Sequence, residues 1–159
     1  MDISSSVLLL SFKSLLLATA LGALIGIERE WARKEAGTRT FSMISLGSAL
    51  FIIISQLSFN QYLGISSLDP SRTLGQIIVG IGFLGAGIII FRTQEGVVRN
   101  LTTAAMMWVT AAIGATVGLG LYWLAILTAF LVVFINIVVL PIEKKVEDRI
   151  CKIQDKKQE

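Results

Sequence analysis

The chain has 159 residues, of which 54% are hydrophobic and only 16% are charged, with a mean hydropathy of +0.77. A soluble domain of this size is not so apolar, so the composition predicts a protein that crosses a membrane several times. Histidine is absent and the single cysteine, Cys151, lies in a charged stretch, which excludes an internal disulfide, a cysteine-based metal cluster and a conventional zinc or copper site.

The first predicted span covers about residues 7–27. No Lys or Arg precedes it and more apolar segments follow, so we expect a retained transmembrane helix and not a signal peptide. Ala18, Gly22 and Gly26 recur every four residues, a spacing with which helices pack closely in membranes. Lys13 either reaches the outer interface or is a buried functional charge, and we favour the first reading.

A second span is expected over about residues 40–59, after a polar loop with charges of both signs. The third, about residues 70–91, contains the sequence GIGFLGAG and should form the centre of a compact bundle. A phosphate-binding glycine loop is the alternative, but such a loop follows a strand, and that context is lacking here. We expect the large residues of this helix to face lipid, namely Ile77, Ile81, Leu84 and Ile88. We expect its small residues to pack against neighbouring helices, namely Gly75, Gly80, Gly82, Gly85, Ala86 and Gly87.

The fourth span, about residues 102–120, carries a further small-residue stripe that includes Gly114 and Gly118. The fifth, about residues 121–140, is bulky and should be the most peripheral. Its Asn136 is either an interhelical hydrogen-bonding group, which we favour, or a substrate ligand. Pro141 should end this helix, leaving residues 141–159 as a short amphipathic tail that lies on the membrane or pairs with a second copy.

The basic residues divide unequally between the two sides of the predicted membrane. Twelve Lys and Arg residues fall on one side, and the other has only Arg72 and, if it reaches outward, Lys13. By the positive-inside rule the N-terminus should be outside and the C-terminus cytoplasmic. The fold class is therefore an all-α membrane protein with five transmembrane helices and packing faces rich in Gly and Ala.

Polar residues collect at the predicted helix ends. The cytoplasmic cluster comprises Glu28, Glu30, Arg39, Arg99 and Asn100, and the outer cluster comprises Asp69, Arg72 and Gln76. These residues either form interfacial ion pairs and helix caps, or they build a functional site in which Arg39 or Arg99 meets Glu28. No nucleophile with a base and no cofactor motif can be assembled, so an enzyme is not expected and no metal ligands are assigned.

Several motifs occur along residues 15–125 in a fixed order: GIERE at 26–30, AGTRT at 36–40, DPSR at 69–72, GIGFLGAG at 80–87 and RNLTTAA at 99–105. In this combination the chain resembles the MgtC/SapB family. The resemblance implies a multi-pass protein of the bacterial inner membrane that is linked to growth in low magnesium and, in pathogens, to survival inside host cells. It also implies membrane partners such as the F-type ATP synthase.

Two departures from the family pattern matter. Phe41 stands where the family often has a histidine, so a role that depends on that histidine does not carry over. The stretch after Pro141 is too short for the folded cytoplasmic domain of many members, and the chain therefore resembles the short, SapB-like ones.

Two functions remain open at this stage. The first is a regulator that packs its helices against another membrane complex, and the second is a small transporter or channel for magnesium or another ion. We favour the regulator, because a magnesium path usually offers carboxylates and the spans lack Asp and Glu away from their ends. The expected surroundings are a lipid bilayer and further copies of the chain, without nucleic acid. No cofactor is required, although magnesium is left open as a ligand.

Overall fold

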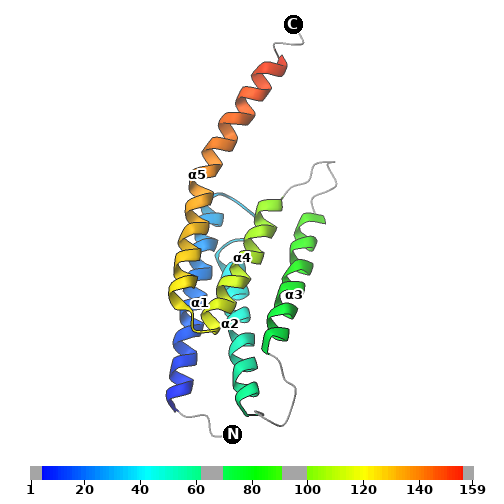
Figure 1. Cartoon of the computed structure of the whole chain (residues 1–159). Helices are drawn as coiled ribbons and strands as arrows, with labels where there is room; N and C mark the ends of the chain where they lie inside the picture. Colours follow the sequence, from blue (N-terminus) through cyan, green and yellow to red (C-terminus); the bar gives the residue numbers. More distant parts are fainter. Residues whose placement is uncertain (1–4, 62–69, 91–99, 156–159) are drawn as a thin grey trace.

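The computed structural model describes residues 5–61, 70–90 and 100–155, with side chains described over 5–58, 71–89 and 100–139. It contains five helices: α1 (Ser5–Trp31), α2 (Thr38–Gln61), α3 (Pro70–Ile90), α4 (Leu101–Gly118) and α5 (Tyr122–Asp155). Each is long and apolar enough to span a membrane. Successive helices run in alternating directions (Figure 1). The prediction of an all-helical membrane protein with five spans is confirmed.

The fifth helix is longer than the sequence predicted. Pro141 does not end it, because α5 continues to Asp155 and extends well beyond the rest of the bundle (Figure 1). A proline removes one backbone hydrogen bond from a helix interior, which costs about 3 kcal/mol. The helix is nevertheless continuous through Pro141, because the hydrogen bonds on both sides of it are kept.

Helix α4 is the centre of the bundle and contacts all four other helices. Over half of its apolar segment, 56%, is buried, whereas only 11% of the α3 segment is buried. The expectation that α3 forms the centre is therefore wrong. Glycine content does not distinguish a helix that packs within its own bundle from one that presents small residues to its surroundings.

Helices α1, α2 and α4 pack at very short distances through glycines. A Cβ atom at position 22 of α1 would lie 2.5 Å from the carbonyl oxygen of Phe41, and Gly26 meets the backbone of Thr38 equally closely. On α4, Gly114 faces the backbone of Ser45. Gly118 lies against α2 in the same way, where a Cβ would be 2.8 Å from the Ala49 carbonyl oxygen. These glycines allow the three backbones to approach and so define the core.

Helix α3 packs on this core through large residues and one of its glycines, Gly85. Ile81 is buried in the same hydrophobic cluster as Met106, Met107 and Ala111 of α4, so its predicted lipid exposure is wrong. Beside this contact, isoleucines of α3 and alanines of α4 line a cavity of about 200 Å³ between the two helices. Gly85 is the one α3 glycine with a close neighbour, since its Cβ would lie 3.6 Å from that of Ala104. At the other α3 glycines a Cβ would meet no atom within 4 Å, namely at Gly75, Gly80, Gly82 and Gly87.

Candidate functional site

A buried arginine lies at the charged end of the bundle, the end at which α1 finishes and α2 begins. The side chain of Arg29 is fully buried in the last turn of α1. Its Nε and Nη2 donate to the two carboxylate oxygens of Glu28, each at 2.7 Å. Its Nη2 also donates to Oδ1 of Asn136 at 3.1 Å, which links α1 to α5. Nη1 has no hydrogen-bond partner among the described residues.

This arrangement neutralises the arginine inside the protein. Glu28 supplies the opposite charge in a bidentate contact, the strongest geometry for such a pair. Asn136 donates in turn from Nδ2 to the Val132 carbonyl oxygen at 2.8 Å, so its side chain is fixed. Asn136 therefore forms an interhelical hydrogen bond, which is the reading that the sequence favoured.

Sequence reasoning did not single out Arg29. The signal was nevertheless present, because the buried positions of α1 include Ala18, Gly22, Ile25 and Arg29, which continue one helical stripe at spacings of four, three and four. An arginine at the end of a packing stripe is buried together with that stripe.

Glu30 connects α1 to the start of α2. Its Oε2 accepts hydrogen bonds from Oγ1 of Thr38 at 2.7 Å and from the backbone N–H of Thr38 at 3.4 Å. Gly37 leaves room for this carboxylate, since a Cβ there would lie 3.3 Å from Oε2. A carboxylate that accepts from the first residue of a helix stabilises the helix N-terminus. Glu30 thus has a structural role at this position.

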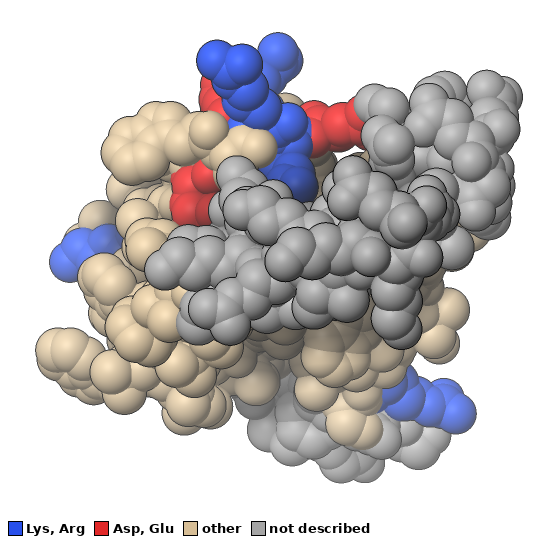
Figure 2. Space-filling view, turned by 90° about the horizontal axis from the view of Figure 1, so that it is seen from above, with Lys and Arg blue, Asp and Glu red and all other residues tan. Residues whose placement is uncertain are grey.

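The two remaining members of the cytoplasmic cluster that the structure describes, Arg39 and Asn100, do not contact Glu28. Asn100 precedes α4 with a positive φ of 67° and donates from Nδ2 to Oε2 of Glu35 at 3.4 Å. Arg39 is exposed on the first turn of α2, and among the described residues Glu28 pairs with Arg29 and not with Arg39. Arg99 lies outside the described residues. Figure 2 looks onto this end and shows acidic and basic side chains next to one another.

Two members of the outer cluster lie on one face of α3, four residues apart. Arg72 and Gln76 are exposed on the first turns of α3, and Asp69 lies outside the described residues. A neighbouring contact joins α2 and α3 at this end of the bundle, because Oγ1 of Thr73 and Oγ of Ser55 are 2.9 Å apart.

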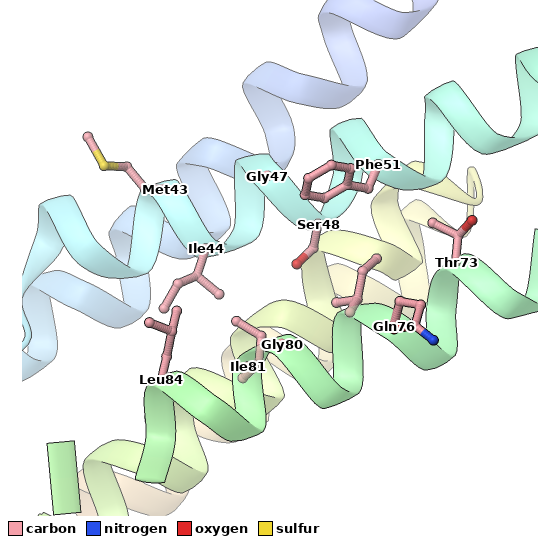
Figure 3. A pocket seen from close by; sticks show the side chains of 11 residues that line it. Met43, Ile44, Gly47, Ser48, Phe51, Thr73, Gln76, Gly80, Ile81 and Leu84 are labelled. Carbon is pink, nitrogen blue, oxygen red and sulfur yellow. The ribbon is translucent and has the colours of Figure 1, made fainter. Parts of the chain in front are cut away.

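A groove runs between α2 and α3. It consists of two adjoining cavities of about 550 and 770 Å³, both lined by Met43, Ile44 and Leu84. The first cavity extends to Thr73 and Gln76, and Figure 3 shows side chains of both helices facing this space. The second extends in the opposite direction along the helices, and its lining includes Glu35, Arg39 and Gly87. We call this continuous space the α2–α3 groove.

Metal-binding side chains are not grouped in the described part of the chain, where no set of three or more His, Cys, Asp or Glu residues could hold an ion. The chemistry that these residues provide is therefore one internal ion pair, two helix-end contacts and an apolar groove with one basic and one acidic side chain, Arg39 and Glu35, at one end.

Comparisons with known proteins identify relatives of this chain. It is 49% identical over 114 residues to "Putative magnesium transporter YhiD" of Escherichia coli (strain K12), covering 70% of this chain and 52% of that protein. It is 42% identical over 125 residues to "Protein MgtC" of Salmonella typhimurium (strain LT2), covering 78% of this chain and 50% of that protein. It is also 42% identical over 129 residues to "Protein SrpB" of Synechococcus elongatus, covering 76% and 69%.

The chain thus spans about half the length of YhiD and MgtC. No solved structure matches it. The model of the MgtC family matches residues 15–145, which includes most of the first span, the other four spans entirely and most of the described chain. The chain belongs to the MgtC family.

Proposed function

We propose that this chain serves magnesium homeostasis in the bacterial inner membrane as a non-enzymatic regulator that docks onto another membrane complex. The link to magnesium is supported by the name of the E. coli relative, which shares 49% of the aligned residues. Family resemblance makes the F-type ATP synthase one candidate partner.

One observation carries the proposal: α3 lies on the outside of its own bundle and presents small residues there. Gly75, Val79, Gly82 and Ala86 form an exposed stripe along its outward face, with the bulky side chains of Ile78 and Phe83 on either side of it. A glycine offers lipid chains little contact area, but it lets the backbone of another helix approach closely. The exposed face of α5 is different, since it is built from bulky residues such as Leu127, Phe130 and Leu131.

The charged end supports the same proposal. The strongest polar contact there, between Arg29 and Glu28, is internal and also ties α1 to α5 through Asn136. Such a contact holds the helix ends in place. The outward face of α3 is then the surface of the bundle best suited to another protein.

Transport of magnesium is the second candidate, and the name of the E. coli relative is what favours it. A transported magnesium ion would need oxygen ligands along a path through the spans, commonly carboxylates. Magnesium flux into liposomes that contain the pure protein distinguishes the two candidates. Regulation predicts flux equal to that of empty liposomes, and saturable flux would favour transport.

A size series at Gly82 tests the docking face. Gly82 has no neighbour within 4 Å, so Gly82→Ala and Gly82→Leu should both fold and insert normally. Gly82→Ala should still restore growth of a deletion strain in low magnesium, whereas Gly82→Leu should fail because its side chain holds a partner helix away. Normal complementation by a well-expressed Gly82→Leu protein would contradict the proposal.

A further inference from the structure

We propose that the α2–α3 groove binds one phospholipid, with its phosphate at Arg39 and one acyl chain lying along the groove. The site is separate from the outward face of α3, so this inference does not rest on the proposed function.

The length of the groove suits one acyl chain. On α2 the lining runs from Arg39 to Phe51, two positions twelve residues apart, which corresponds to a rise of about 18 Å along a helix. The hydrocarbon of one leaflet is about 15 Å thick, half of a typical bilayer core. A lipid whose head group is at the charged end would therefore extend its chain to about the level of Gly47 and Ser48.

The walls of the groove suit a hydrocarbon chain. They are mostly apolar, and three of the lining residues are glycines at which a Cβ would meet no atom within 4 Å, namely Gly47, Gly80 and Gly87. In Figure 3 the α2 side chains Ile44 and Ser48 and the α3 side chain Leu84 extend into the space between the two helices. The missing side chains at the glycines create the depth that a methylene chain would fill.

One of the two charged side chains at the charged end, Arg39, suits a phosphate. Arg39 lines the groove at the charged end, is exposed, and forms no hydrogen bond or ion pair with another described residue. Glu35 lines the same end, and its carboxylate accepts a hydrogen bond from Asn100. A guanidinium group pairs with phosphate oxygens through two parallel donors, so Arg39 is suited to a phospholipid head group.

The opposite end of the groove argues against a transmembrane helix as the occupant. There the hydroxyl groups of Thr73 and Ser55 are 2.9 Å apart and join α3 to α2. A chain that enters from Arg39 can stop before this contact. A membrane-spanning helix, which is about 10 Å wide, would have to pass it.

Native mass spectrometry of the purified protein with added phosphatidylglycerol tests the site. We expect one tightly retained lipid per chain. Arg39→Gln should lower its retention about tenfold through loss of a charge-assisted contact, and Gly80→Leu should abolish retention by filling the groove. Gly75→Leu is the matched control, because Gly75 is equally open but does not line the groove, and it should retain the lipid.

A second measurement locates the chain. Phe51→Trp, compared with the unsubstituted protein, should add a fluorescence component that is quenched by lipids brominated near the end of the acyl chain. Gly80→Leu in the same background should reduce that quenching. Equal retention of lipid by Arg39→Gln, Gly80→Leu and the unsubstituted protein would overturn the proposal. A photoreactive residue placed at position 80 that cross-links to another protein helix, and not to lipid, would also overturn the proposal.

Discussion

Replacing Gly114 by alanine should destabilise the protein, because this residue lies where α4 and α2 are closest. A Cβ at position 114 would overlap the carbonyl oxygen of Ser45 and lie 2.8 Å from its Cα. Ordinary contacts begin at 3.4 Å, so α2 would have to move by more than about 0.6 Å, since the carbonyl oxygen is closer still than the Cα, with the strain typical of an overpacked core. The atoms in the way belong to the backbone, which cannot rotate aside as a side chain can.

We expect Gly114→Ala to lower the free energy of unfolding by about 1–3 kcal/mol, the usual cost of added volume in a packed core. Thermal unfolding in detergent micelles, followed by circular dichroism, measures the change. Gly82→Ala is the matched control, since it adds the same methyl group where no atom lies within 4 Å, and it should leave the midpoint unchanged. Equal midpoints for Gly114→Ala and the unsubstituted protein would refute the account of the core, as would equal destabilisation of both variants.

Three further predictions follow from named contacts. Glu28→Gln should lower the free energy of unfolding by about 3–5 kcal/mol in the same assay, because it leaves the buried charge of Arg29 uncompensated. A Glu28→Gln protein that is stable and folded but does not restore growth of a deletion strain in low magnesium would instead support a functional site. Asn136→Leu should cost about 1–3 kcal/mol by removing a hydrogen bond to the same guanidinium group, and an unchanged midpoint would contradict the α1–α5 link. For the topology, a reporter active only in the cytoplasm should work after Glu159 and fail in the 60–68 loop, and the reverse result would reject the charge-based orientation.

Much of the fold could be predicted from the sequence. The five spans follow from apolar segments of membrane length, and the four-residue spacing of Gly22 and Gly26 indicated a close helix contact that the structure places against α2. These features are local, because each depends on residues within one helix. The position of α3 is not local. Whether its isoleucines or its glycines face inward depends on the alanine-rich surface of α4, which lies elsewhere in the chain.

The candidate site shows the same division. Glu28 and Glu30 lie at the charged end as the sequence predicted, but their partners differ from those that were considered. Glu28 pairs with its neighbour Arg29, and Glu30 caps α2 through Thr38. Motif spacing shows which polar residues share one side of the membrane, whereas the direction in which each side chain packs depends on the helices that surround it.

The central claim, that the outward face of α3 contacts another protein, is tested most directly by photocross-linking in living cells. A photoreactive phenylalanine analogue is introduced at position 79 on α3 or, as the control, at position 131 on α5. Val79 and Leu131 are both highly exposed, at 67% and 56%, and each lies nine residues after the start of its helix. We expect position 79 to yield a discrete adduct with a subunit of another membrane complex, identified by mass spectrometry and lost in Gly82→Leu, whereas position 131 yields only lipid adducts. An adduct with a second copy of this chain, or lipid adducts alone from both positions, would contradict the claim.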